Sequence, residues 1–271
     1  MCIRDRNKAF EKAGFKNAIV AKIQPDDADW DAGDVRYNVV RWASTPDPRY
    51  SGYGPSVANP RTGEIIAADI VQEFNAIKRG YTYRKLWGYT EDNDPLEQWI
   101  VSLTMHEVGH TLGLRHNFKA SWIYDAKDVH DVSITGDNHI GSVMDYDPIN
   151  LAPKGTPQGN YFPTGPGSYD IWAIEFGYTP GLTDKDRENL LSKSTQPEYI
   201  FGTDGDAMSS PGVNIDPRNY RGDMSNDPIT YTADRIETID AKILELPDLS
   251  LIHISEPTRQ EAISYAVFCL K

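Results

Sequence analysis

The chain has 271 residues, with 27 lysines and arginines against 40 aspartates and glutamates, so its formal net charge is −13 at pH 7. A protein this acidic repels phosphate groups, and we therefore expect no nucleic acid partner. No apolar run approaches the length that crosses a bilayer, so we also expect no membrane span.

The two ends of the chain resemble translated sequencing adapter. Residues 1–6, MCIRDR, correspond to a reading frame of a transposon end used in sequencing-library preparation, and residues 249–254, LSLIHI, correspond to its reverse complement. We therefore expect residues 1–6 and 249–271 to be artefactual and exclude them from the predicted fold. Both cysteines, Cys2 and Cys269, lie in these ends, so no disulfide framework is predicted.

The first elements are predicted to be short. Residues 7–15 have the pattern of a helix that ends near Gly14, and residues 17–23 that of a strand. The acidic segment 25–34, PDDADWDAGD, is interpreted as a solvated loop, with a structural calcium site on its carboxylates as the alternative.

More strand signals follow. Residues 35–44 have the β-branched and aromatic content of a buried strand. Residues 51–71 predict two extended pieces around a turn at 59–63, and the second piece is expected to continue into a helix over 71–80.

A long helix is then marked at both ends. Asn93 or Asp94 can cap it, Pro95 suits its first turn, and Gly113 can end it. Its predicted stripe, in three- and four-residue steps, comprises Leu96, Trp99, Ile100, Leu103, His106 and His110. This stripe begins apolar and ends in imidazoles, so the helix is expected to pack into a core and deliver its last turns to a site.

Beyond the helix, residues 117–168 are rich in Gly, Pro, Asp and Asn, and a loop this long in a compact domain is usually functional. Helical patterns return over 167–178, 183–194 and 231–246. Strands first and helices later predict an α+β domain.

Three histidines and a glutamate lie within eleven residues, HEVGHTLGLRH, at the end of the long helix. His106 and His110 are one turn apart, about 5–6 Å between Cβ atoms, so both imidazoles can reach one zinc ion. Gly113 lets the chain leave the helix, and His116 can then return beneath the metal. Three nitrogen ligands leave one position open, as in catalytic zinc sites.

Glu107 lies about 100° around the helix from the ligand pair, so we expect it to face the open position rather than bind the metal. There it can act as general base and then general acid in amide hydrolysis. The alternative is a helix whose histidines are satisfied by ordinary packing. Average residue usage gives a chance match to the five fixed positions on the order of one in a hundred thousand, which favours the metal site.

The segment SVMDY, residues 142–146, follows in an irregular region, and the two motifs together resemble the metzincin family of zinc endopeptidases. The resemblance implies that Met144 forms an apolar floor, the Met-turn, beneath the histidines without binding zinc. It also implies that Tyr146 hydrogen-bonds the developing oxyanion during reaction. Asn117, directly after the third histidine, differs from the residues that better-known metzincin families have there.

The wider chain resembles large secreted bacterial metzincin-type peptidases. The similar segments are 7–15, 34–42, 60–70, 106–118, 142–146 and 169–178, together with 201–207 and 227–237. This resemblance implies a secreted, periplasmic or cell-surface location. It also implies a metzincin-like fold, in which a twisted mixed sheet and a long active-site helix precede a loop-rich and helical C-terminal lobe.

We divide the chain accordingly. Residues 7–113 are expected to hold the sheet and the active-site helix, residues 114–180 the third ligand and the Met-turn, and residues 181–248 a helical extension.

The resemblance further implies that an exposed edge strand holds a peptide substrate antiparallel above the cleft. Residues 63–71 are the candidate, with an ordinary buried strand as the alternative. The loop 118–141 is expected to shape the pocket for the residue after the scissile bond. His130 and His139 within it are interpreted as surface-loop histidines rather than ligands of a second site.

The leading hypothesis is a zinc-dependent endopeptidase with one catalytic Zn²⁺ and a protein or peptide substrate. The alternatives are a non-catalytic binding module stabilised by zinc and a zinc hydrolase of a non-peptide amide. The sequence indicates neither an oligomeric state nor a cleavage preference.

Overall fold

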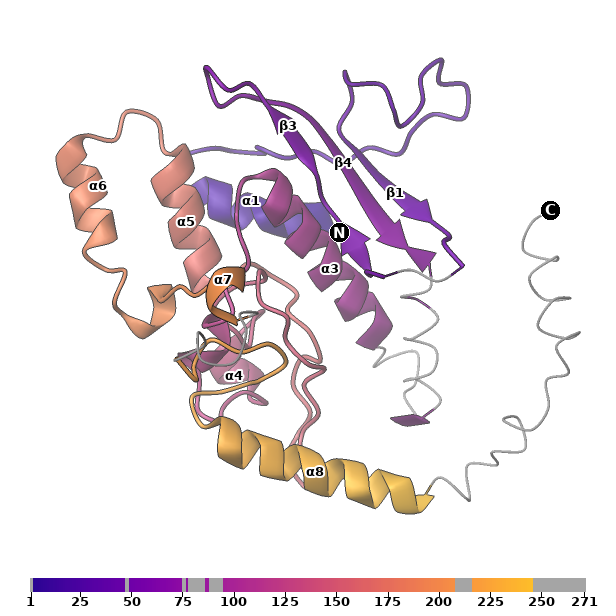
Figure 1. Cartoon of the computed structure of the whole chain (residues 1–271), viewed down its shortest axis with the longest axis vertical. Helices are drawn as coiled ribbons and strands as arrows, with labels where there is room; N and C mark the ends of the chain where they lie inside the picture. The colour runs from indigo at the N-terminus through magenta and orange to yellow at the C-terminus, as the bar shows by residue number, and fades with distance from the viewer. Residues whose placement is uncertain are drawn as a thin grey trace, which may run out of the picture.

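The computed structural model describes residues 2–46, 49–74, 77, 86–87, 95–207 and 216–245. A twisted sheet lies beside the long helix α3, and loops and further helices lie below and to one side (Figure 1). The strands are β1 (Val39–Ala43), β2 (Gly52–Tyr53), β3 (Ser56–Ala58) and β4 (Ile65–Glu73). The helices are α1 (Cys2–Lys12), α3 (Pro95–Thr111), α4 (Val132–Thr135), α5 (Ser168–Tyr178), α6 (Asp184–Leu191), α7 (Asp204–Ala207) and α8 (Pro228–Glu245), with 3₁₀ turns η2 (Ala120–Ile123) and η3 (Pro197–Tyr199).

The central strand of the sheet is β4. β1 pairs with it in parallel, from Val39 opposite Asp69 to Ala43 opposite Glu73, and β2 and β3 pair antiparallel with its other side. The predicted mixed sheet is confirmed. The choice of residues 63–71 as an edge strand is wrong, because both sides of β4 are already hydrogen-bonded. In the described part of the chain, that antiparallel edge is formed by residues 52–58, which we call the edge segment.

Two predictions for the N-terminal strands are also wrong. Residues 17–23 form no strand, because the Asn7 side chain bonds both the carbonyl and the N–H of Ile19, at 2.9 and 3.0 Å, where a neighbouring strand would otherwise bond. β1 is a strand as predicted, but it is not buried: Trp42 is 50% exposed. Residues 25–34 form a mostly exposed loop with turns, as interpreted, and the calcium alternative stays a prediction.

The long helix α3 has the predicted start at Pro95 and ends at Thr111. Gly113 follows with φ of 88°, a left-handed conformation that ends the helix. The predicted capping residues Asn93 and Asp94 lie outside the described residues, as do residues 75, 76 and 78–80 of the helix predicted over 71–80. Residues 71–73 of that range belong to β4 instead.

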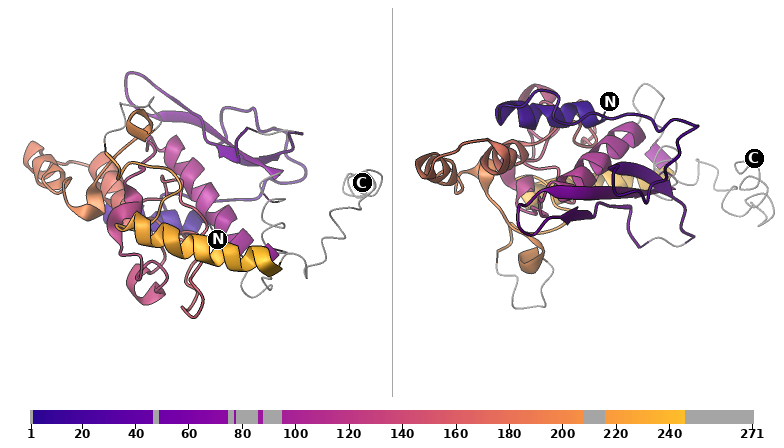
Figure 2. Two further views of the ribbon diagram at one scale, coloured as in Figure 1. Left: turned by 60° about the horizontal axis from the view of Figure 1, so that its bottom comes forward. Right: turned by 90° about the horizontal axis from the view of Figure 1, so that it is seen from above.

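The helix α3 is packed on several sides. Seen from above, it lies between α1 and the sheet, both of which it contacts (Figure 2). Met105, with no exposed surface, packs with Val101 against Val143 and Met144. The predicted apolar stripe is only half-buried at Leu96, Trp99, Ile100 and Leu103. Most side chains in the C-terminal half of α3 are buried, whichever way they face. A single apolar stripe therefore did not predict which residues of this helix are buried.

Helix α1 packs on α5 and also contacts α3. Ala9 and Phe10 of α1 and Ala13, directly after it, form a buried cluster with Ile174. The Tyr178 hydroxyl donates to the carbonyl of Leu112 at 2.9 Å. The predicted helices over 167–178, 183–194 and 231–246 are confirmed as α5, α6 and α8.

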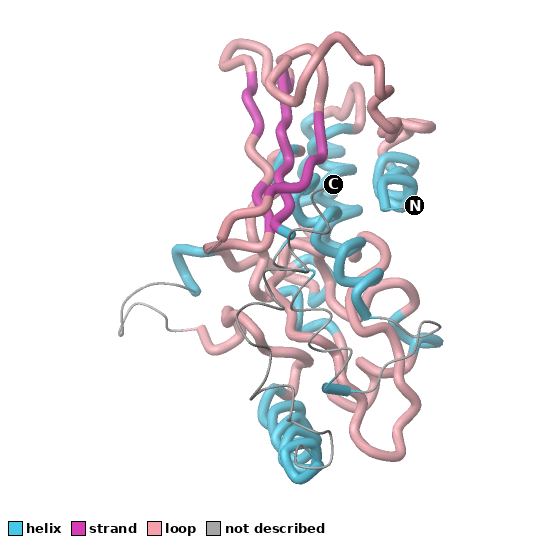
Figure 3. The backbone as a smooth tube through the Cα atoms, turned by 90° about the vertical axis from the view of Figure 1, so that its right-hand side faces the viewer, coloured by secondary structure: helices cyan, strands magenta, loops and turns pink. Residues whose placement is uncertain are grey.

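Residues 117–168 are mostly irregular but well packed. His130 and His139 are 5% and 1% exposed, so their interpretation as surface-loop histidines is wrong. The His130 ring stacks at 6.5 Å on that of Tyr231, and His139 Nε2 lies 3.4 Å from the Asp147 carboxylate. Tyr231 belongs to α8, which lies at the end of the molecule opposite the strands and covers this region (Figure 3). This long-range cover explains the burial.

No helix in the described ranges is long and apolar enough to cross a membrane. Residues 249–271 lie outside the described residues, and the interpretation of both chain ends as adapter stays a prediction.

Candidate metal centre

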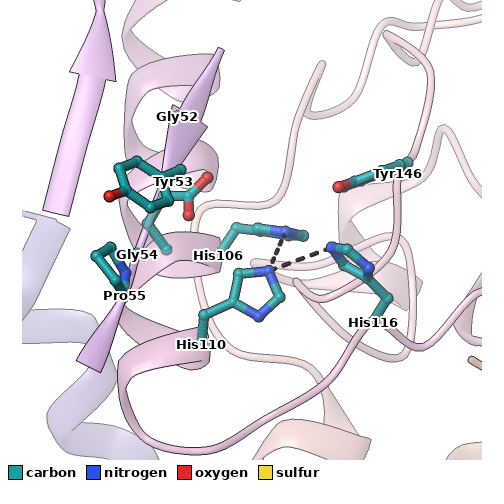
Figure 4. Close-up of a pocket in the computed structure, with 9 residues that line it drawn as sticks. Gly52, Tyr53, Gly54, Pro55, His106, His110, His116 and Tyr146 are labelled. Atoms are coloured by element: carbon teal, nitrogen blue, oxygen red, sulfur yellow. Dashed lines mark hydrogen bonds between the residues drawn. The ribbon is translucent and has the colours of Figure 1, made fainter. Parts of the chain in front are cut away.

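The three predicted ligand histidines converge. His106 and His110 come from successive turns of α3, and His116 returns from the chain beyond Gly113 (Figure 4). The Nε2 atom of His110 lies 3.1 Å from that of His106 and 3.2 Å from that of His116. These separations match ligand atoms about 2.0–2.1 Å from a shared tetrahedral ion. Among the described residues, this is the only cluster of three or more such side chains close enough to hold a metal.

The outward nitrogen of each histidine ring has its own acceptor. Nδ1 of His106 donates to the carbonyl of Val143 at 2.7 Å, and Nδ1 of His110 to the carbonyl of Leu114 at 3.0 Å. Nδ1 of His116 donates to the Asp204 carboxylate at 2.7 Å. Since Nδ1 carries the proton in each case, the three Nε2 lone pairs face one another, which is the donor set that zinc requires.

Glu107 is buried beside the histidines, with 4% of its surface exposed. Its Oε2 atom has no hydrogen-bond partner among the described residues, and burial raises the pKa of its carboxyl to about 7. An unpartnered buried carboxylate oxygen is costly unless it serves a ligand or a reaction. Glu107 therefore lies at the cavity beside the three histidines and is not a member of their cluster.

Met144 and Tyr146 differ in their relation to the histidines. Met144 has no exposed surface and packs against Met105 of α3. The Tyr146 ring lies 5.4 Å from the ring of His106 and 4.6 Å from that of His116, and it remains 42% exposed. Tyr146 thus stands at the rim of the site, whereas Met144 belongs to a buried cluster with α3, and its Met-turn role stays a prediction.

A family model described as Met-zincin matches residues 89–260, well over half of the chain. The chain belongs to the Met-zincin family. It is accordingly a metzincin-type zinc metalloprotease domain of α+β fold, as the two motifs predicted. No curated protein and no solved structure matches the chain. The matched range contains all three histidines, Met144 and Tyr146.

In this Met-zincin, the cavity above the histidines has a wall that the sequence did not predict. The cavity is lined by Gly52, Tyr53, Gly54, Pro55, His106, Glu107, His110, His116 and Tyr146. Tyr53 and Tyr146 lie on opposite sides of the histidines (Figure 4). No residue of 118–141 lines this cavity, so the expectation that this loop shapes the pocket is not met there.

Contact between the edge segment and α3 is unusually close. A Cβ atom on Gly54 would lie 2.3 Å from the backbone oxygen of Glu107, and one on Gly52 would lie 2.8 Å from its Oε1. At Gly54 only glycine fits, because a side chain would meet the helix backbone, whereas a side chain at Gly52 would require the Glu107 side chain to shift. Gly54 therefore lets the edge segment lie directly against α3. The sequence shows both glycines, but their close contact with α3 is visible only in the tertiary structure.

Two carboxylates in this Met-zincin site were not singled out from the sequence. Asp204 holds His116, and its segment was noted only as similar to bacterial relatives. Asp170 is 2% exposed and accepts from Ser142 Oγ, at 2.5 Å, and from the N–H groups of Val143 and Gly167, at 2.9 and 2.8 Å. Asp170 therefore fixes the backbone that carries the Val143 acceptor of His106.

Proposed function

We propose that this Met-zincin domain is a zinc-dependent endopeptidase in which Glu107 is the general base and acid. The observation that carries the proposal is a buried carboxylate, with one unpartnered oxygen, at a cavity whose floor is a three-histidine cluster. The fitting residues are His106, His110 and His116. Zinc held by them would supply a Lewis acid for the substrate carbonyl and would lower the pKa of a bound water.

Glu107 exchanges the protons of the reaction. It accepts a proton from the attacking water and then donates it to the departing amine, as a general base and acid. Such an exchange works best for a group whose pKa lies near the working pH. Burial, which raises the pKa of Glu107 to about 7, supports this role.

Tyr146 stabilises the charge that develops on the carbonyl oxygen by hydrogen bonding from its hydroxyl. Its place at the rim, in ring contact with His106 and His116, supports this role. The Phe118 ring also contacts Tyr146, at 5.3 Å between ring centroids. Met144 forms the apolar Met-turn beneath the ligands and does not bind zinc.

The edge segment binds the substrate as an extended strand. Its residues 52–55 line the cavity, and it is already antiparallel to β4. Backbone pairing of this kind gives affinity with little preference for side chains. A chain bound along the edge places an internal peptide bond over the histidines, which favours cleavage inside a polypeptide.

A structural zinc in a binding module is the competing function. It needs a fourth protein ligand, and the cluster contains only three among the described residues. A structural site also needs no buried base at its open side.

We propose, from the resemblance alone, that the protein acts outside the cytoplasm.

Zinc content and cleavage of an unstructured protein test the proposal together. We expect one zinc per chain, and hydrolysis of casein and of a peptide blocked at both ends, all lost on chelation and restored by zinc. A chain that binds zinc but hydrolyses only non-peptide amides, or that holds its zinc through a fourth protein ligand, would contradict it.

A further inference from the structure

We infer that Asp204 is a positioning residue that fixes the ring and the protonation of His116 and so tightens zinc binding, an inference that rests on the proposed function. The Oδ1 atom of Asp204 accepts from Nδ1 of His116 at 2.7 Å. The other two ligand rings donate to backbone carbonyls. Within the part of the chain that the structure describes, the Nδ1 bond of His116 is the one of these three that ends on a carboxylate.

The third ligand needs such a brace more than the first two. His106 and His110 are held by α3, whereas His116 follows the end of the helix and lies in irregular backbone. Its ring packs against Phe118 at 5.1 Å between centroids, a contact that restricts the ring but does not choose which nitrogen carries the proton. The carboxylate does select the tautomer, because it accepts a hydrogen bond from Nδ1–H, which keeps the proton on Nδ1 and leaves the Nε2 lone pair directed at the metal position.

Asn117 brings Asp204 to this position across 87 residues of chain. It is completely buried, and its side chain donates to the carbonyl of Ile200 at 3.0 Å and accepts from the N–H of Gly202 at 3.1 Å. The N–H of Phe118 donates to the carbonyl of Gly202 at 2.7 Å. These three bonds join the segment that leads into α7 to the residues directly after the third ligand.

The second oxygen of Asp204 is also held. The Thr203 hydroxyl lies 3.2 Å from Oδ2, so the carboxylate cannot rotate away from His116 without losing a bond. The proposed metal ligand His116 is therefore held by the Asp204 carboxylate, and the buried amide of Asn117 holds the backbone that leads to Asp204. Loss of such partners typically weakens metal binding about 10–100-fold.

Zinc affinity in the full chain tests the inference, measured by competition with a chromophoric chelator. Asp204→Ala is expected to raise the Kd for zinc about 10–100-fold. The matched control is Asp206→Ala, which removes the same charge from an exposed position of the same short helix and should leave the Kd unchanged. Asp204→Asn, which keeps the size and one acceptor oxygen, should fall between Asp204→Ala and the unsubstituted chain.

Two further measurements separate positioning from general stability. The visible spectrum of the cobalt-substituted protein should change in Asp204→Ala and not in Asp206→Ala, because only the first alters a ligand. The Tm of the metal-free protein should be the same for both.

Asn117→Ala should raise the Kd for zinc but have little further effect in an Asp204→Ala background, because both residues act on His116 through the same set of hydrogen bonds.

The outcomes are distinct. If the unsubstituted chain binds no zinc, the proposed function fails. If that chain binds zinc and Asp204→Ala binds it as tightly as Asp206→Ala, the proposed function stands and the inference about Asp204 is overturned.

Discussion

Single atoms decide the chemistry of this site. Each ligand histidine has one nitrogen committed to an oxygen acceptor, and only the other is directed at its neighbours. Glu107 has one carboxylate oxygen without a partner in the described part of the chain. Hydrolysis needs this arrangement, because the nitrogens that bind a metal and the carboxylate that moves a proton must not be hydrogen-bonded to each other.

Glu107→Gln tests the proton-transfer role. The amide keeps the size of the side chain but cannot accept a proton, so we expect casein hydrolysis to fall by about 10²–10⁴-fold while zinc content is unchanged. Glu97→Gln, at an exposed position in the first turn of the same helix, is the control and should retain full activity. A Glu107→Gln protein that still cleaves casein at the original rate would remove the residue from this role.

Tyr146→Phe tests stabilisation of the oxyanion. Loss of one hydrogen-bond donor to a developing oxyanion typically lowers kcat by about 10²–10³-fold. We expect such a fall with little change in KM or zinc content, because the hydroxyl acts only as charge develops. Tyr220→Phe, at a 62% exposed position, is the control. An equal loss in kcat and in zinc content would instead identify Tyr146 as part of the metal-binding structure.

At the scale of elements, the contact between the edge segment and α3 brings the proposed substrate-binding edge to the helix that carries His106, Glu107 and His110. Because a methyl group on Gly54 would meet the backbone of Glu107, Gly54→Ala must push the segment away or distort the helix. We expect a loss of about 1–3 kcal/mol in the free energy of unfolding, together with a rise in KM.

Gly177→Ala is the matched control for that substitution. Gly177 lies in α5, and a Cβ atom there would meet nothing within 4 Å. Alanine should stabilise this helix by about 0.5–1 kcal/mol without affecting KM. Chemical denaturation and peptide kinetics measure both variants. Equal effects of the two substitutions would contradict the close contact at Gly54.

At the scale of the whole molecule, the buried His130 and the half-buried Asp223 give opposite dependences of stability on pH. Burial lowers the pKa of His130 from 6.5 to about 4, so the unfolded chain binds that proton first and stability is lost as pH falls through this window. Burial raises the pKa of Asp223 from 3.8 to about 6, so the folded chain binds its proton first and stability is gained as pH falls from 6.

Single substitutions should separate these two contributions. In Asp223→Asn, one of the carboxyls that oppose the His130 effect is removed, while the raised pKa values of Glu107 and Asp145 remain. Stability should therefore fall more steeply than in the unsubstituted chain between pH 6.5 and 4, by up to about 3 kcal/mol. In His130→Leu, the slope should become flatter or reverse. Urea denaturation of the metal-free protein at several pH values measures both slopes. Shifts of the same sign in the two variants would contradict this account.

Local features of the sequence predicted the zinc site well, because its main parts are local. Two histidines one turn apart, a glycine that ends the helix and a third histidine soon after specify their own geometry. The helices α5, α6 and α8 were likewise predictable from their periodicity. The predictions that failed depended on long-range contacts. The Asn7 side chain bonds the backbone of Ile19 where a strand was predicted, and α8 covers His130.

The sequence by itself determined the three-histidine cluster, the glutamate beside it and the family, since eleven consecutive residues fix the spacing and chirality of those groups. Only the tertiary structure decided which strand forms the edge, what closes the cavity wall and which carboxylate faces His116. Strand propensity identifies a strand but not its neighbours, and Asp204 reaches the third ligand through contacts that no local pattern encodes. Those choices depend on how distant segments share one buried volume.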